Sequence, residues 1–346
     1  MRKILVTGGA GFIGSNFVEK VFDRHPDDEI VVLDVFTYAS NPENIPERIA
    51  KSKRFSLVRG NIRDPEVVNA LVSKVDAVVH FAAESHVTRS IADDTVFFET
   101  DVMGTHTIAN AVAKNRSRIE KFVHISTSEV YGTAESAPMT EDHPLNPCTP
   151  YAAAKAGADR LVYAYRICHD IPLVLIRPFN NYGPKQHLEK VVPRFITQAI
   201  CDEPLRVHGN GLMTRDWVYV EDTCDAVLSA LNGGVVGDKR LCGQTINLGT
   251  GTDTSINDIA EAVVDFLGKP RHLIEHVEAR PGQVDRHISS TTKSWELLGW
   301  KPKTTLFGGL PRTIRWYQEN RAWWEKQRQA SEVTVAHRKT GKLSAF

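Results

Sequence analysis

The stretch ILVTGGAGFIG, residues 4–14, passes from an apolar run through a glycine-rich turn into a helical pattern that continues to about Phe22. A strand, a glycine turn and a helix in this order form the context that a dinucleotide-binding motif requires. Gly8 permits a tight turn, Gly11 lets the backbone approach a pyrophosphate, and Gly14 allows close packing of the helix. The N–H groups and positive dipole end of that helix would face the phosphates.

A carboxylate ends the second expected strand. The apolar run at residues 30–33 leads to Asp34, roughly twenty residues beyond the glycines, where an acidic side chain accepts hydrogen bonds from ribose hydroxyls and repels a 2′-phosphate. The sequence therefore predicts NAD as the cofactor rather than NADP.

The third and fourth strands, expected at residues 55–59 and 77–81, add cofactor contacts. Asp64 either contacts the cofactor or only caps the helix that follows Pro65, and both roles stay open. Small residues after the fourth strand let the backbone run close to the cofactor. The residues predicted to bind the cofactor are Gly8, Gly11, Phe12, Ile13, Gly14, Asp34, Ile62, Asp64, Ala82, Ala83, Tyr151 and Lys155.

A second group of polar side chains follows the apolar run at residues 121–125. Two hydroxyls and a carboxylate, residues 127–129, come at the end of this expected strand, where an open α/β sheet presents its chemistry. Tyr151 and Lys155 are four apart at the start of a helical pattern, so both project from one face. Such a pair usually forms an ordinary solvated face, but a lysine ammonium also favours the phenolate and makes the tyrosine a usable base. The predicted catalytic residues are Thr127, Ser128, Glu129, Tyr151 and Lys155.

Strands and helices alternate regularly to about residue 178 and less regularly afterwards. We therefore expect an α/β fold, a doubly wound parallel sheet of the Rossmann type with a smaller, discontinuous substrate-binding lobe over the carboxyl ends of the strands. The cofactor domain would comprise residues 1–178 with a return segment at 217–250, and the lobe residues 179–216 and 251–325. Residues 326–346 lack periodicity and are expected to form a mobile tail.

The composition is that of an ordinary globular protein of 346 residues, with 42% hydrophobic and 24% charged residues. Lys plus Arg and Asp plus Glu both number 42, so no basic field favours nucleic acid and no polybasic patch favours a membrane. Five cysteines without C-x-x-C spacing fit reduced thiols in a cytoplasmic protein, and thirteen histidines show no metal-ligand spacing. A small-molecule ligand, no metal and a cytoplasmic location are therefore expected.

Taken in order, the motifs cover about 320 residues and resemble one known group. Besides the glycine turn and Tyr151-x-x-x-Lys155, they are Thr37-Tyr38-Ala39, residues 82–87 with Arg89-Ser90, residues 127–132, residues 180–184, Glu189-Lys190 and residues 215–217. The chain resembles the extended short-chain dehydrogenase/reductase family of nucleotide-sugar enzymes, and within it the 4,6-dehydratases that act on dTDP-glucose.

The resemblance implies a reaction in which NAD stays bound and is recycled. Tyr151, assisted by Lys155 and Thr127, would take the proton of the sugar 4-hydroxyl while the C4 hydride passes to NAD. Glu129 would then remove the C5 proton, water would leave from C6, and the hydride would return to C6. The product would be a 4-keto-6-deoxy sugar nucleotide, made from a dTDP- or UDP-hexose.

One position departs from this pattern. The dTDP-glucose enzymes carry Asp between the Thr and the Glu, as the acid for the leaving 6-hydroxyl, whereas this chain has Ser128. UDP-glucuronate decarboxylases carry Ser-Glu there and add an arginine in the small lobe, where Ile288 stands here with Arg286 close by. Decarboxylation is therefore the second hypothesis. The third is 4-epimerisation, a reaction that needs no carboxylate at the position of Glu129.

The resemblance also implies which residues hold the substrate. Guanidinium and ammonium groups suit a diphosphate. A non-catalytic NAD-binding regulator, the hypothesis from a different class, would keep the glycine turn but would not need the catalytic residues. The expected substrate-binding residues are Ser85, His86, Asn181, Glu189, Lys190, Val191, Arg215, Asn247 and Arg280.

Two helical patterns, at residues 96–113 and 151–168, carry apolar side chains on more than one face. A helix that is apolar beyond its core stripe has a second packing partner. We therefore expect a homodimer that joins through a bundle of these helices.

Overall fold

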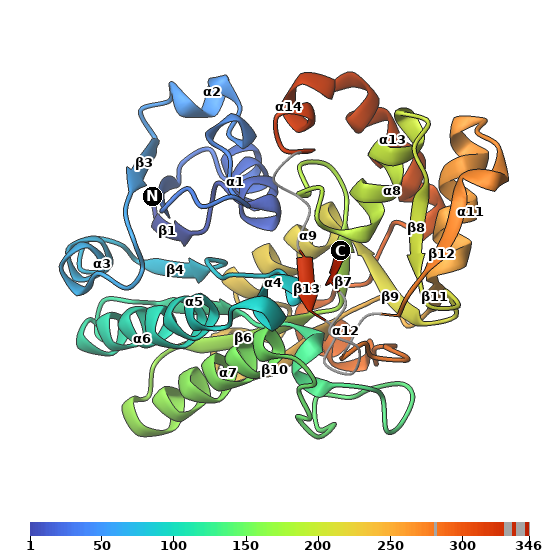
Figure 1. The fold of residues 1–346 in the computed structure, drawn as a ribbon. Coiled ribbons are helices and arrows are strands. Elements are labelled where there is room, and N and C mark those ends of the chain that lie inside the picture. Colours follow the sequence, from blue (N-terminus) through green and yellow to red (C-terminus); the bar gives the residue numbers. More distant parts are fainter. Residues whose placement is uncertain (280–281, 329–333, 337–342, 346) are drawn as a thin grey trace.

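The computed structural model describes residues 1–279, 282–328, 334–336 and 343–345 (Figure 1). Its main sheet is made of β1 (Lys3–Thr7), β2 (Glu29–Asp34), β3 (Phe55–Arg59), β4 (Ala77–His80), β5 (Lys121–Ile125), β6 (Leu173–Pro178) and β10 (Thr245–Leu248). The seven strands lie in the order β10-β6-β5-β4-β1-β2-β3, and all neighbours are parallel. The predicted α/β fold of the Rossmann type is confirmed.

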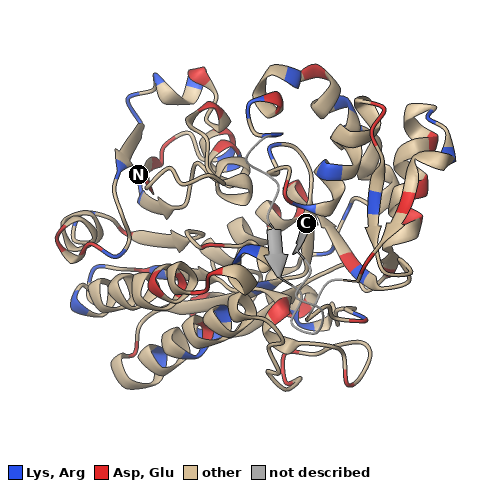
Figure 2. Cartoon of the chain, in the orientation of Figure 1, with Lys and Arg blue, Asp and Glu red and all other residues tan. Residues whose placement is uncertain are grey.

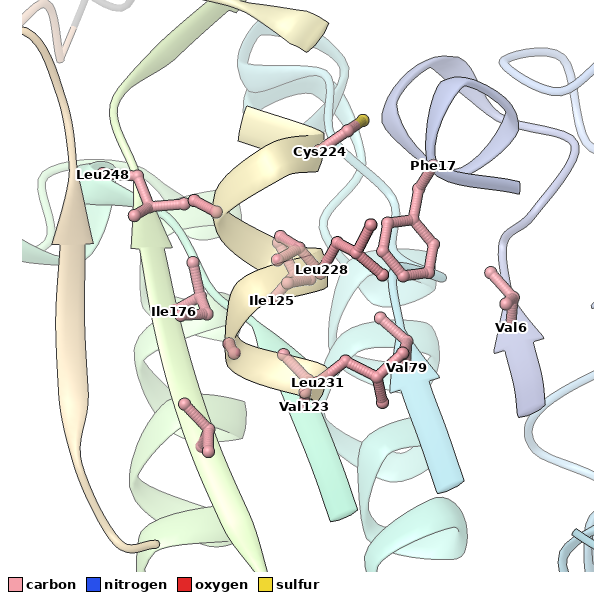
Figure 3. Packing of buried hydrophobic residues seen from close by; sticks show 14 of the residues in the cluster. Val6, Phe17, Val79, Val123, Ile125, Ile176, Cys224, Leu228, Leu231 and Leu248 are labelled. Atoms are coloured by element: carbon pink, nitrogen blue, oxygen red, sulfur yellow. The ribbon is translucent and has the colours of Figure 1, made fainter. Parts of the chain in front are cut away.

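Helices cover both faces of this sheet, because its strands are apolar on both sides. One face carries α1 (Phe12–Arg24) and α9 (Val220–Leu231), and the other carries α3 (Pro65–Val72), α6 (Thr105–Lys114) and α7 (Pro150–His169). Figure 3 shows Leu228 and Leu231 of α9 beside Phe17 of α1, over Val79 and Val123 of the sheet. Short helices complete this part of the chain: α2 (Glu47–Ala50), α4 (Val87–Ala92), α5 (Thr95–Phe97) and α10 (Asp238–Leu241), with 3-10 turns at Pro42–Asn44 and Ser128–Tyr131.

The helix expected at residues 96–113 is interrupted. Between α5 and α6 the backbone forms a π-helical stretch, Phe98–Gly104, which buries the carboxylate of Asp101. A π-helical turn inserts a residue into a helix, so the 3.6-residue period on either side does not reveal it. In the small lobe, α13 (Leu306–Glu319) ends before Asn320, and α14 (Arg321–Glu325) follows directly.

A second core lies in the smaller lobe, at the upper right of Figure 1. It packs Phe195, Val263, Leu310 and Trp324 among the lobe's helices and strands. The elements are β7 (Asn180–Tyr182), β9 (Thr214–Tyr219) and β11 (Asp253–Ser255) in one sheet, β8 (Leu205–His208) and β12 (Ile274–Val277) in another, with α8 (Val191–Ile200), α11 (Ile256–Leu267), a 3-10 turn at Arg271–Leu273, α13 and α14.

The domain boundaries stay a prediction, and the packing adds one observation to them. Leu297 and Leu298 of α12 (Thr292–Leu298), together with Trp300, belong to the core on the α9 side of the main sheet. A segment from the expected lobe range therefore packs against the cofactor domain.

The tail lies partly outside the described residues, so its expected mobility stays a prediction. In its described part, β13 (Thr334–Ala336) and β14 (Leu343–Ala345) pair antiparallel. Figure 2 shows Lys and Arg interspersed with Asp and Glu over the described chain, without a one-signed stripe. Among the described helices, none has the length and apolar character that crossing a membrane requires.

Candidate active site

A cavity of about 670 Å³ lies at the carboxyl ends of the main strands and is lined by both the sheet and the small lobe. Most of the residues predicted for the site line it. The predicted residues that line it are Gly8, Gly11, Phe12, Ile13, Gly14, Asp34, Ile62, Ala82, Ala83, Ser85, His86, Thr127, Ser128, Glu129, Tyr151, Lys155, Asn181, Glu189, Lys190, Val191 and Arg215.

Three predicted residues are not among the described residues of that lining. Asp64 caps α3, because its carboxylate accepts hydrogen bonds from the N–H groups of Glu66 at 2.9 Å and Val67 at 3.3 Å. The capping role is thus the one that the structure supports. Asn247 is fully buried and bonds elsewhere, and Arg280 lies outside the described residues.

The side chain of Asn247 belongs to a structural network. Its Oδ1 accepts from the Tyr131 hydroxyl at 2.7 Å, and its Nδ2 donates to the carbonyl of Met139 at 3.1 Å. Arg177 donates to the same tyrosine and to Asp159. The expected contact between Asn247 and substrate is therefore not supported, because these protein partners hold its amide away from the cavity.

The glycine turn has the close approaches that the motif predicts. Gly8 has φ +67°, and a Cβ there would lie 2.6 Å from the backbone nitrogen of Ala82. A Cβ on Gly14 would lie 2.2 Å from the carbonyl oxygen of Gly8. No side chain caps the N-terminus of α1 and its first turn holds no acidic residue, so its N–H groups face the cavity ready for an anion.

Asp34 stands where the ribose of a dinucleotide would lie. Its Oδ2 accepts from the Ala10 N–H at 3.0 Å, and its Oδ1 accepts from the Phe36 N–H at 2.9 Å. Each carboxylate oxygen has a further lone pair, so these two bonds orient the carboxylate and leave it able to accept hydrogen bonds from a ligand. The donor-rich turn and this fixed carboxylate fit NAD.

The predicted catalytic side chains meet at the end of β5. Thr127 begins the 3-10 turn there, and its Oγ1 accepts from the Glu129 N–H at 3.2 Å. At the start of α7, the Tyr151 N–H donates to the Ser90 hydroxyl at 3.1 Å. Lys155 crosses from the next turn of α7 and its Nζ donates to the carbonyl of Ile125 at 2.8 Å.

Burial dominates the electrostatics of the tyrosine and the lysine. Burial raises the pKa of Tyr151, the carboxylates of Asp101 and Glu129 raise it further, and a hydrogen bond with Thr127 lowers it. Burial also lowers the pKa of Lys155, against the pull of Asp101. The described side chains on their own therefore leave the phenol protonated, and the predicted role of Lys155 in activating Tyr151 stays a prediction.

Asp101 is a charged group that the sequence did not reveal. It is 1% exposed, and its Oδ1 accepts from the Glu84 N–H at 2.8 Å. Burial raises the pKa of its carboxyl to about 7, while the ammonium of Lys155 lowers it. Asp101 lies on the π-helical stretch, where the regular 3.6-residue period does not apply. A helical wheel drawn from the sequence would therefore not predict that its side chain faces Lys155.

A cluster of charges lines the cavity below the small lobe, centred on Glu189. Its Oε1 lies 3.5 Å from Lys190 Nζ, and its Oε2 lies 3.7 Å from His86 Nε2 and 3.7 Å from His187 Nδ1. Burial raises the pKa of Glu189, and Lys190 lowers it. Lys190 also donates to the carbonyl of Ser85, so this cluster ties the small lobe to the loop after β4.

The small lobe contributes guanidinium groups to the lining of the cavity. Arg215 was predicted, and its Nη1 and Nη2 donate to the carbonyls of Thr214 at 2.9 Å and Val284 at 2.8 Å. Arg194 and Arg206 also line the cavity and were not predicted. The alternation of Leu205, Arg206, Val207 and His208 along β8 could have indicated that Arg206 and His208 share one face.

Arg286 does not take part in the site. Its Nε donates to Asp253 Oδ2 at 2.7 Å, the side chain is half exposed, and it is not part of the described lining of the cavity. An arginine that binds a sugar carboxylate would have to face that cavity. Arg286 therefore does not supply the arginine that a decarboxylase would need in this cavity.

Known proteins match this chain over most of its length. Residues 5–313 match the family model described as GDP-mannose 4,6-dehydratase. The low-salt glycan biosynthesis protein Agl12 of Haloferax volcanii is 43% identical over 91% of this chain and 98% of that protein. A dTDP-glucose 4,6-dehydratase of Mycobacterium tuberculosis is 39% identical over 97% and 99%.

A solved structure shows the same arrangement of the whole chain. DesIV, a dTDP-glucose 4,6-dehydratase from Streptomyces venezuelae solved with NAD and dTDP bound, superposes with a TM-score of 0.89 at 39% identity. The match covers 94% of this chain and 100% of that one.

The parallel sheet, the glycine turn and the tyrosine–lysine pair together define an NAD-dependent enzyme of the short-chain dehydrogenase/reductase type. Within that class, the chain belongs to the GDP-mannose 4,6-dehydratase family. It is a nucleotide-sugar 4,6-dehydratase with NAD as its cofactor, as the sequence predicted.

Proposed function

We propose that the substrate is dTDP-glucose or a closely related dTDP- or UDP-hexose. The observation that carries this proposal is the meeting of Thr127, Glu129, Tyr151 and Lys155 in one cavity with the NAD motif and with arginines of the small lobe. A diphosphate suits those arginines, which would leave the hexose beside the catalytic groups. The dTDP-glucose 4,6-dehydratases among the relatives, matched over nearly their whole length, support thymine as the base.

Each protein group would have one task in the reaction. Bound NAD supplies the acceptor for the C4 hydride, gives it back at C6 and adds a positive charge near the phenol. Tyr151 would take the proton of the 4-hydroxyl, with Thr127 holding the phenol and Lys155 compensating its charge. Glu129, fixed by the turn that Thr127 caps, would remove the C5 proton once C4 is a ketone and later return it.

The substrate is tested by incubating the holoenzyme with a panel of nucleotide hexoses and weighing the products by mass spectrometry. Loss of water from dTDP-glucose, faster than from UDP-glucose or GDP-mannose, is the expected result. Loss of carbon dioxide from UDP-glucuronate would instead make the enzyme a decarboxylase, and conversion without a change in mass would make it an epimerase.

We also infer that the working enzyme is a homodimer. The helical segments around residues 96–113 and 151–168 expose large apolar side chains, which a second copy of the chain would cover. These side chains are Val96, Phe98 and Met103 from the first helical segment and Tyr163 and Ile167 from α7. A bundle of four helices, two from each copy, would bury them.

Light scattering at micromolar concentration should then report twice the chain mass. Ile167, the most exposed of the five at 67%, offers the sharpest variant, since Ile167→Lys would place a charge in the contact and yield single chains. Leu212→Lys, an equally exposed leucine of the small lobe, is the matched control and should leave the mass unchanged. A wild-type protein that scatters as one chain would contradict the inference.

The five cysteines also bear on where the enzyme works. All of them are free, and Cys148 and Cys168 are exposed. Exposed unpaired thiols suit a reducing compartment, which supports the cytoplasm as the location.

A further inference from the structure

Ser128 stands where an acid is needed, and the structure pairs it with a histidine. Ser128 Oγ lies 3.4 Å from Nδ1 of His287, 159 residues away along the chain. The other ring nitrogen of His287, Nε2, lies 2.7 Å from the carbonyl oxygen of Gly132. Both side chains are buried, with His287 at 0% and Ser128 at 1% exposure, and Ser128 lines the cavity.

The hydrogen bonds determine the state of the imidazole ring. A carbonyl oxygen only accepts, so Nε2 carries a hydrogen and donates it to Gly132. Nδ1 therefore accepts from the Ser128 hydroxyl when the ring is neutral, and donates to Ser128 Oγ when the ring is protonated. In the protonated state the Ser128 hydroxyl hydrogen becomes available to a group in the cavity.

We propose that His287 and Ser128 act together as the proton donor for the departing 6-hydroxyl, with His287 as the positioning and proton-holding residue and Ser128 as the group that touches the sugar. The proposal rests on the dehydration proposed above. It explains how the chain manages without the aspartate that the dTDP-glucose enzymes carry at position 128.

The proton and electron counts balance. As Glu129 takes the C5 proton, the electron pair of the C5–H bond forms the C5–C6 double bond and the C6–O bond breaks with its pair on oxygen. The Ser128 hydroxyl proton passes to that oxygen, which leaves as water, while the Nδ1 proton of His287 passes to Ser128. The His287 ring ends neutral. Tyr151 has gained one proton from the 4-hydroxyl, and His287 has lost one to the departing water, so the total number of protons on the protein is unchanged. Proton exchange with solvent then returns Tyr151 and His287 to their starting states.

Burial is the largest influence on His287 and leaves its pKa below the usual value, so the neutral ring is the resting state and the imidazolium depends on the groups around it. Burial lowers its pKa, the Glu129 carboxylate raises it, Arg215 lowers it, the bond to Gly132 raises it, and His143 lowers it. Glu129 comes from the turn after β5, Arg215 from β9 and His143 from the loop before α7, while the ring of Phe179 meets the imidazole at 6.0 Å. The carboxylate that receives the C5 proton is thus also the group that favours the imidazolium.

The test compares two leaving groups. Fluoride departs without a full proton, so a dTDP-6-deoxy-6-fluoroglucose should need no acid. We expect His287→Gln to slow dehydration of dTDP-glucose by about 100-fold or more, in the range that general acids supply, and to slow fluoride loss by less than about 5-fold. Ser128→Ala should behave in the same way. Exchange of the C5 proton should continue in both variants, because Glu129 and Tyr151 are intact.

A restoring variant and a control complete the experiment. Ser128→Asp should support dehydration without His287, so the double variant Ser128→Asp/His287→Gln should regain most of the lost rate. His25→Gln removes a histidine at the end of α1, outside the described lining of the cavity, whose Nδ1 lies 3.8 Å from Asp28 Oδ2, and it should change neither reaction. The wild-type rate of dehydration should fall as pH rises through the pKa of the imidazolium, and His287→Gln should lose that dependence.

The outcomes separate the proposal from a structural role. Equal losses on both substrates, or full activity of His287→Gln on dTDP-glucose, would overturn it. If His287→Gln does not fold, Ser128→Ala carries the same comparison of leaving groups. A wild-type enzyme that converts neither substrate would contradict the proposed function and not this proposal alone. Nitrogen NMR of labelled histidine in the resting protein adds a readout without turnover, since Ser128→Ala should shift the Nδ1 signal of His287 and leave its Nε2–H in place.

Discussion

Glu129→Gln should keep its NAD and still oxidise C4, yet it should lose exchange of the C5 proton with solvent by about 10²- to 10⁴-fold, as the removal of a general base does. The amide has nearly the shape of the carboxylate, so the Thr127 hydrogen bond to the backbone N–H of residue 129 should persist. An amide cannot take a proton from carbon, so dehydration should stop with exchange. The measurement is deuterium incorporation at C5, followed by NMR during turnover in heavy water.

Glu296→Gln is the matched control, because Glu296 is exposed on α12 away from the cavity. It should exchange at the wild-type rate. Undiminished exchange in Glu129→Gln would assign the C5 proton to another base. A loss of bound NAD in that variant would mean that the substitution disturbs the cavity and not only the chemistry.

Tyr151→Phe should bind NAD and the nucleotide sugar but lose turnover by about 10²- to 10⁴-fold, because no phenol is left to take the 4-hydroxyl proton. The ring is 9% exposed and its edge packs against Phe97 at a centroid distance of 6.3 Å, contacts that phenylalanine keeps. Unlike Glu129→Gln, this variant should also fail to exchange the C5 proton, because that proton becomes acidic only after C4 is oxidised.

Tyr165→Phe, about four turns further along the same helix, is its control and should retain full activity. NAD content is measured after heat release of the cofactor, and turnover by product mass. Exchange at C5 that survives in Tyr151→Phe would show that another group oxidises the sugar and would contradict the order of steps proposed here.

The fold was predictable because its signals are local. Each strand of the main sheet is an apolar run that ends in a turn, and the glycine motif fixes where the first helix begins. The catalytic set followed from its place at the end of β5 and at the start of α7. Asp64 shows the limit of this approach, since the same residue type at a helix start serves equally as a cap.

The parts of the site that the sequence did not predict depend on contacts between residues far apart in the chain, which no local sequence pattern indicates. The bond between Ser128 and His287 joins residues 159 apart, and no spacing in the sequence indicates it. Asn247 follows the pattern of a polar residue near a strand end, yet long-range partners, Tyr131 and Met139, decide where its side chain points. Asp101 faces Lys155 only because the helix changes its winding over Phe98–Gly104.

The place of residues 297–300 in the core beside α9 has a consequence for biosynthesis. As the chain leaves the ribosome, the first strands emerge long before α9, β10 and the segment from Leu297 to Trp300, all of which cover the same apolar face. A nascent fragment that stops at residue 178 would leave Val123 and Ile176 on an open surface and invite aggregation. The cofactor-binding half is therefore no separable module: it matures only when nearly the entire polypeptide has been synthesised.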